Sequence, residues 1–457
     1  MQRTWLPLVM AIVAVIVAST PVLGASPTPS SHHQGPGPVN LGSPAAQLRI
    51  DLDRLLAEHA FLTIEQMRSG LTNAPDFGAA AKAVEANSTE IAAAIGSIYG
   101  DAAIEPFGDI WRSHIGFLVD YAVGLGKDDT AVQQTALSGL TVYRARLAKF
   151  LGDANPGIAL GAIAEALDMH TAQLLEFIDT EHRGDHTAAY AIERTAYLHM
   201  FHVGDALAKV IANKFPKRFT GVDVAYSAAG ALRVTLDRLL AEHAFLAAEA
   251  MRSGVKGAPD FDSAKQAIDG NSTDLQAVVA AAYGAQAGAA FRTLWDGHLS
   301  GYVAYIDATR INDPAARAQA TNQLNTYAGQ IAEFLAGANP YLNAGALSTL
   351  FQEHAGHLIG QVEAFAAADF DGTYALVRAG YAHMFTAGEA LASGIATQLP
   401  DKFPATAGAP ATDTVGGAVS HWPGLELLVL LAAVLVVAGA VGLAGSARLA
   451  RMRRRRG

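Results

Sequence analysis

The stretch that decides the fold is residues 52–62, LDRLLAEHAFL, which returns letter for letter as residues 236–246. Its leucines and its one histidine fall three, four, seven and ten positions after the first leucine, which is the spacing of one face of an α-helix. We therefore expect an amphipathic helix that carries His59 on its apolar face and ends near Ser69 and Gly70. The same helix should occur again around His243.

The repetition extends far beyond this stretch. Residues 48–219 align without gaps with residues 232–403 at one constant offset, which carries His59 onto His243 and which we call the repeat offset. Matched positions include a tryptophan, an Asn-Pro pair and a His-Met-Phe string: Trp111 with Trp295, Asn155-Pro156 with Asn339-Pro340, and His199-Met200-Phe201 with His383-Met384-Phe385. A repeat of this length predicts two homologous domains, one over 47–219 and one over 232–403.

Within each copy the apolar residues follow the period of a helix, and signals for strands are scarce. After its first helix, copy 1 should contain helices at about 89–99, 104–125, 130–151, 157–182 and 186–213. Asn87, followed by Glu90, is expected to cap the first of these. The predicted fold class is all-α, with two tandem up-and-down helical bundles and one C-terminal transmembrane helix.

The N-terminal segment has the composition of a targeting signal. Residues 1–25 combine Arg3, an apolar run and a small-residue end at Gly24 and Ala25, so we expect a cleaved signal peptide. The segments that flank the two copies are rich in small residues and proline, and they are expected to be a disordered linker at 26–46 and a stalk at 404–424.

The C-terminal segment predicts a membrane anchor. Residues 425–445 are apolar apart from Glu426 and are long enough to cross a bilayer. The basic tail at 446–457 should remain in the cytoplasm, because arginines beside a span are retained on that side. We therefore expect a single-pass protein of the cell membrane, with both helical copies outside the cell.

The formal net charge of −10 conceals a more acidic exported part. The six arginines of the tail, together with Arg3 and Glu426, carry a net charge of +6, so the exported part carries −16. A surface this acidic argues against nucleic acid as a partner. The sequence has no cysteine, which excludes disulfide bonds and thiolate metal ligands.

Eight of the fifteen histidines form four pairs at the repeat offset: His59 with His243, His114 with His298, His170 with His354, and His199 with His383. Each pair lies on a different predicted helix, on its apolar face, so all four should point into the core. Buried imidazole is neutral, which is the form that binds metal ions, and one ion can satisfy several imidazoles. We therefore predict one copper or zinc site per copy, with binding that weakens between about pH 6.5 and 5.

Other residues and other interpretations stay open at this stage. Carboxylates beside the first histidine and methionines that recur at the repeat offset could support the site: Glu58, Glu242, Met67, Met200, Met251 and Met384. Haem held without covalent attachment is an alternative to a metal ion. A structural interpretation treats each histidine as a core residue that is hydrogen-bonded to a carbonyl or a carboxylate. The protein would then be a structural or interaction module.

The pattern LLAEH, WxxH, His and YxHMF covers most of both copies and resembles exported bacterial proteins labelled copper amine oxidase-like. This resemblance favours copper, although the Asn-Tyr-Asp/Glu motif of copper amine oxidases is absent. The architecture is similar to hemerythrin and ferritin-like bundles, without the Glu-x-x-His motif of ferritin-like di-metal sites. We therefore expect a surface-tethered protein without catalytic residues, which sequesters, senses or transfers a transition metal. An enzyme or redox protein that uses the bound metal or haem is a further alternative.

Overall fold

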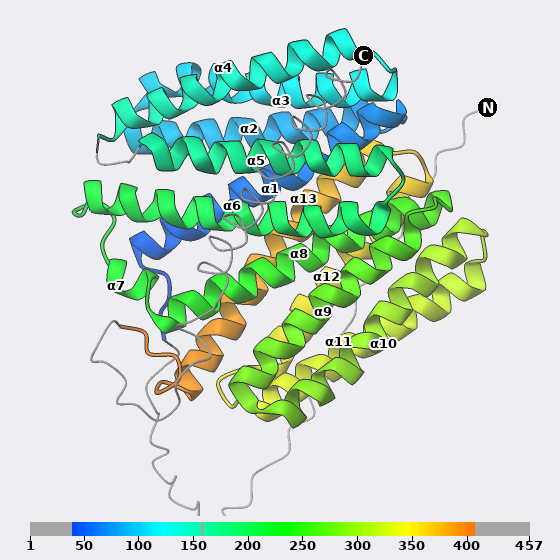
Figure 1. Ribbon diagram of the computed structural model, residues 1–457. Helices are drawn as coiled ribbons and strands as arrows, with labels where there is room; N and C mark the ends of the chain where they lie inside the picture. The colour runs from blue at the N-terminus through cyan, green and yellow to red at the C-terminus, as the bar shows by residue number, and fades with distance from the viewer. Residues whose placement is uncertain (1–38, 157–159, 407–457) are drawn as a thin grey trace, which may run out of the picture. The chain divides into compact units, whose positions relative to one another are not determined.

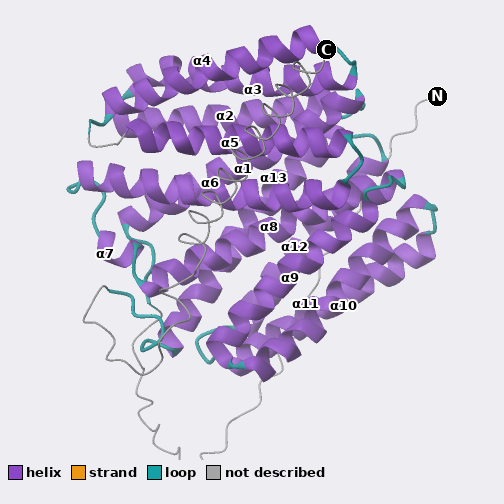
Figure 2. Ribbon diagram, in the orientation of Figure 1, coloured by secondary structure: helices purple, strands orange, loops and turns teal. Residues whose placement is uncertain are grey.

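The computed structural model describes residues 39–156 and 160–406, and the regular elements of these residues are all helices (Figures 1 and 2). Copy 1 contains α1 (Pro44–Thr72), α2 (Phe77–Tyr99), α3 (Ile104–Gly126), α4 (Thr130–Ala154), α5 (Leu160–His182) and α6 (His186–Lys214). Copy 2 repeats them as α8 (Ala228–Lys256), α9 (Phe261–Tyr283), α10 (Ala285–Arg310), α11 (Pro314–Ala338), α12 (Ala344–Ala366) and α13 (Phe370–Gln398). The short η1 (Asp101–Ala103) precedes α3, and α7 (Val222–Ala225) joins the copies. The all-α fold class is confirmed.

Several predicted segments lie outside the described residues. They are the signal peptide at 1–25, most of the linker at 26–46, the stalk beyond residue 406, the transmembrane helix at 425–445 and the basic tail at 446–457. Among the helices that are described, none is both long and apolar enough to cross a membrane. The end of the predicted linker belongs to α1, which begins at Pro44 after Ser43 caps it by accepting the Ala46 amide at 3.2 Å.

The second helix of each copy differs from its prediction. α2 begins at Phe77, well before the predicted start at 89, so Asn87 lies inside the helix and is not its cap. The Asn87 side chain is buried and donates to the Leu55 carbonyl at 3.0 Å and to Glu58 at 2.9 Å. Asn271 does the same in copy 2. The early part of α2 is rich in alanine, which favours helix but contributes little to a hydrophobic period.

The first helix of each copy is its central element. α1 packs against α2, α3, α5 and α6, and α8 packs against α9, α10, α12 and α13. Every residue from Leu55 to Gly70, and every residue from Leu239 to Gly254, is therefore buried. A helix with neighbours all around it buries its polar residues too, so these residues need partners within the protein. The histidine of the repeated motif thereby lies in the core.

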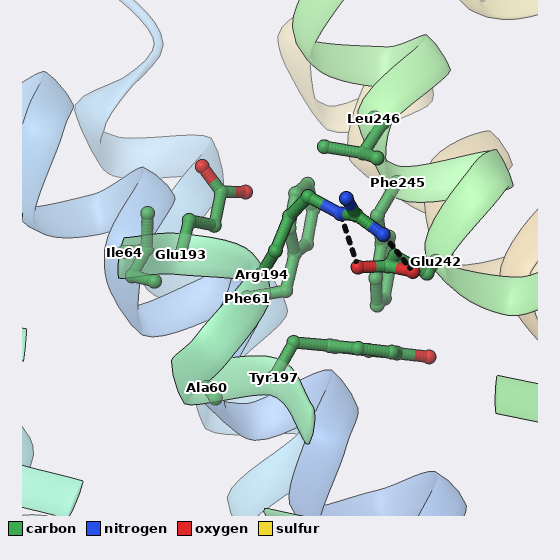
Figure 3. Close-up of a pocket in the computed structure, with 9 residues that line it drawn as sticks. All are labelled: Ala60, Phe61, Ile64, Glu193, Arg194, Tyr197, Glu242, Phe245 and Leu246. Carbon is green, nitrogen blue, oxygen red and sulfur yellow. Dashed lines mark hydrogen bonds and ion pairs between the residues drawn. The ribbon is translucent and has the colours of Figure 1, made fainter. Parts of the chain in front are cut away.

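The two copies pack against each other through two equivalent pairs of helices. α6 of copy 1 contacts α9 of copy 2, and α13 of copy 2 contacts α2 of copy 1. Arg194 on α6 pairs with Glu242, with Nε and Oε1 2.8 Å apart (Figure 3). Arg378 on α13 pairs with Glu58 at 2.9 Å. Because the repeat offset relates the two arginines to each other and the two glutamates to each other, the interface has approximate two-fold symmetry.

A buried group of charged residues, which we call the central charge cluster, lies at the same interface. It consists of Glu65, Arg68, Glu193, Glu249 and Arg252. Arg68 lies 2.5 Å from Glu65 of its own copy and 2.5 Å from Glu249 of the other. Burial and the neighbouring Glu249 raise the pKa of Glu193 to about 8, whereas the arginines hold the pKa of Glu249 at about 2 against the effect of burial.

Candidate metal centre

Three of the four predicted histidines of copy 1 converge. They are His59 on α1, His114 on α3 and His170 on α5, and we call them the first triad. One ring nitrogen from each lies within 4.8 Å of the others, and the Nε2 atoms of His59 and His114 are 3.0 Å apart. Because metal ions bind imidazole nitrogen at about 2.0–2.1 Å, small side-chain adjustments would bring all three nitrogens onto one ion.

The same arrangement occurs in copy 2. His243 on α8, His298 on α10 and His354 on α12 form the second triad, and their ring nitrogens also lie within 4.8 Å of one another. The ring centroids are 5.2, 5.7 and 6.4 Å apart, close to the 5.0, 5.7 and 6.2 Å of the first triad. The convergence is therefore a property of the repeated unit.

Many of the triad nitrogens lack a protein partner. Within the described ranges, neither ring nitrogen of His170, His243 or His354 forms a hydrogen bond, although all three side chains are buried. A buried polar atom that gives up water without gaining a partner costs about 1–3 kcal/mol. A bound cation would take the lone-pair nitrogen of each imidazole of a triad, so one ion would satisfy three of these buried atoms at once.

One histidine of each triad is oriented by the tryptophan one turn before it. Nδ1 of His114 donates to the backbone carbonyl of Trp111, and Nδ1 of His298 donates to that of Trp295 at 3.0 Å. Once Nδ1 carries the proton, Nε2 keeps its lone pair and is available as a metal ligand. The WxxH spacing in the sequence thus fixes both the tautomer and the orientation of the ring.

Tyrosine rings form a wall of each triad that the sequence analysis missed. Tyr143 on α4 stacks on His114 with ring centroids 4.4 Å apart, and Tyr327 on α11 stacks on His298 at 4.7 Å. Both tyrosines are buried, so they help to exclude water from the triads. They could have been found from the sequence, because the two tyrosines are also related by the repeat offset.

Burial lowers the pKa of all six triad imidazoles. The pKa of His114 falls from 6.5 to about 3 and that of His298 to about 4, and in both the main cause is loss of hydration. The pKa values of the other four histidines are also lowered well below 6.5. Burial is again the main cause, and the neighbouring imidazoles contribute further. Protons should therefore compete with a metal ion only below the window of pH 6.5 to 5 that the sequence suggested.

The fourth predicted pair lies outside the triads. His199 on α6 donates from Nε2 to the Ala166 carbonyl at 3.0 Å, and His383 on α13 donates to the Leu350 carbonyl at 2.9 Å. Each of these rings already has a partner in the backbone of the preceding helix. Both rings are half-buried, and the structure brings together three of the four predicted histidines of each copy, with the fourth outside the group.

The carboxylates and methionines proposed to support the site have other surroundings. Glu58 accepts from Asn87 and pairs with Arg378, so its contacts serve the interface between the copies, and Glu242 has the equivalent contacts. The four methionines are buried in hydrophobic clusters: Met67, Met200 and Met384 in the largest one, and Met251 in a second one that consists of copy 2 residues and Tyr190 of copy 1.

Three neutral imidazoles without a thiolate are a ligand set that suits zinc or copper. Comparison of the chain with protein-family models, with curated proteins and with solved structures gives no match. The resemblance to copper amine oxidase-like proteins stays a hypothesis. The function of the protein must therefore be inferred from the triads themselves.

Proposed function

We propose that the protein binds one copper or zinc ion in each triad and that it sequesters, senses or transfers this metal. The observation that carries the proposal is the convergence, in both copies, of three buried imidazoles, of which His170 in copy 1 and both His243 and His354 in copy 2 form no hydrogen bond with the described residues. Three ligands that converge on one point favour a single ion over a haem, which takes at most two axial histidines. The triad side chains are 0–7% exposed, which favours retention of the metal over rapid exchange.

The metal-free chain should take up two tight equivalents of Zn²⁺ or Cu²⁺. Binding should stabilise the fold by about 2.7 kcal/mol when the free metal is at a hundredfold excess over its Kd. Because burial lowers the pKa of the triad imidazoles, both equivalents should remain bound at pH 5.5, where a free imidazole is mostly protonated. Equilibrium dialysis with elemental analysis, and thermal unfolding with and without metal, would measure both effects.

Two results would contradict this proposal. If added metal leaves Tm unchanged and none is retained after dialysis, the histidines serve packing alone. If the chain instead binds haem with an intense visible absorption band and excludes metal ions, the haem alternative is correct.

We also propose that both copies are displayed outside the cell. The proposal rests on the sequence of residues 1–25 and 425–457, in which a signal-like start and an arginine-terminated apolar span predict this orientation. Protease added to intact cells should then digest the helical copies and leave a tag placed after residue 457 protected. Digestion of the tag with protection of the copies would overturn the orientation.

A further inference from the structure

Copy 2 carries, near its triad and closer to the surface, three more side chains of types that can bind metal ions. They are Glu353 and His357 on α12 and His383 on α13, and we call them the outer group. The rings of His357 and His383 lie 5.4 Å apart between centroids, and a Glu353 carboxylate oxygen lies 3.7 Å from Nδ1 of His383. The two histidines are half-buried and Glu353 is exposed, so this group is accessible from solvent, unlike the triad.

Both histidines of the outer group have a nitrogen available as a ligand. His383 donates from Nε2 to the Leu350 carbonyl, which leaves the lone pair of Nδ1 on the side that faces Glu353. Nδ1 of His357 is buried and has no hydrogen-bond partner in the part of the chain that the structure describes. Two imidazoles and one carboxylate are an established ligand set for zinc. The three side chains do not bring one ligand atom each within 4.8 Å of one another as the triads do, so binding requires a rotation of the Glu353 side chain, which is 60% exposed.

The outer group is confined to copy 2, although the two copies are otherwise closely related. The positions of Glu353 and His357 hold Met169 and Gln173 in copy 1, whereas His199 is retained at the position of His383. The neighbouring helix has changed as well. A Cβ atom at Gly380 would lie 3.3 Å from the Cβ of His357, and copy 1 has Ala196 at that position. Two positions of the outer group and a neighbouring position of α13 therefore differ between the copies.

The outer group is adjacent to the second triad. His354 of the triad precedes His357 by three positions on α12, so both lie on one face of that helix. The ring of His354 lies 5.7 Å from that of His243 and 6.4 Å from that of His298 between centroids, and this triad member is one helical turn away from His357 of the outer group.

We propose that Glu353, His357 and His383 form a second, weaker transition-metal site in copy 2, which takes Zn²⁺ or Cu²⁺ from solvent and passes it to the buried triad through His354. The binding part of this proposal stands on the outer group alone. The transfer part rests on the proposed function of the triads. No oxidation or reduction is involved, since the ion only exchanges ligands.

The test converts the outer group into its counterpart in copy 1. The whole chain should bind a third, weaker equivalent of Zn²⁺ in calorimetric titration, beyond the two tight ones. In the variant Glu353→Met/His357→Gln the third equivalent should weaken at least tenfold, while the two tight equivalents and Tm remain. The second triad should also fill more slowly, whereas the first triad fills at its former rate, as followed by stopped-flow absorbance with Co²⁺.

The reciprocal variant is Met169→Glu/Gln173→His/Ala196→Gly, which builds the outer group into copy 1. It should gain a further weak equivalent and speed the filling of the first triad. A third equivalent that survives Glu353→Met/His357→Gln, or one that the wild type never shows, would overturn the outer site. Loss of the third equivalent with unchanged filling of the second triad would overturn the transfer step. Absence of the two tight equivalents, with the weak one retained, would contradict the proposed function but not the outer site.

Discussion

The variant His170→Ala should bind one tight metal equivalent in place of two, and His170→Ala/His354→Ala should bind none. Both histidines belong to the triads, and neither ring forms a hydrogen bond with the described part of the protein, so their removal takes away metal ligands without breaking a protein contact of this kind. The affinity of the altered site should fall by more than about 100-fold, because loss of a partner that merely orients a ligand already costs about 10–100-fold. Equilibrium dialysis of the purified variants measures the number of equivalents.

His199→Ala is the matched control for this prediction. The residue is a histidine of the same copy and its ring donates to the Ala166 carbonyl, but it lies outside the first triad. This variant should keep both tight equivalents, even if the lost hydrogen bond lowers stability by about 1 kcal/mol. Equal loss of metal in His199→Ala and His170→Ala would show that His199 is a fourth ligand of the site. Two equivalents in both variants would show that the metal binds elsewhere.

The variant Arg68→Met should lower the free energy of unfolding by about 3–5 kcal/mol, because an uncompensated buried charge is costly. Arg68 lies at the centre of the central charge cluster and contacts Glu65, Glu193 and Glu249. Removing it would leave Glu249 buried with only Arg252 to compensate its charge. Denaturant unfolding of the metal-free chain at pH 7, followed by circular dichroism, measures the change.

Lys82→Met is the control for a charge pair at the surface. Lys82 also bridges the two copies, with Nζ 2.6 Å from a carboxylate oxygen of Asp371, but the side chains are 71% and 59% exposed. Water screens this pair, so the variant should change stability by less than about 1 kcal/mol. Similar small effects of Arg68→Met and Lys82→Met would show that the central charge cluster does not stabilise the fold.

The sequence alone predicted the helical architecture because the repeat and the helical period are both visible in the order of the residues. It placed His59, His114 and His170 on apolar faces, and these faces do converge. It could not separate His199 from them. The difference is the Ala166 carbonyl, which becomes accessible to His199 only through the packing of α6 on α5.

The interface between the copies could not be predicted, because its partners are far apart in the chain. Glu58 seemed to belong with its neighbour His59, yet it pairs with Arg378 of the other copy. Asn87 resembled a helix cap, since a single sequence does not show that the alanine-rich residues before it are already helical. In both cases the partner of the side chain lies on another helix, and such a contact cannot be read from the neighbouring residues in the sequence.

The most direct test of the account is the X-ray absorption spectrum of the chain loaded with two equivalents of Zn²⁺. The triads predict a first shell with three imidazole nitrogens at about 2.0–2.1 Å, and with the outer-shell scattering that imidazole rings produce. The signal of three imidazole ligands should be absent from the spectrum of His170→Ala/His354→Ala. A first shell made of oxygen ligands alone, or a spectrum that is unchanged in the double variant, would contradict the assignment of the two triads as the metal sites.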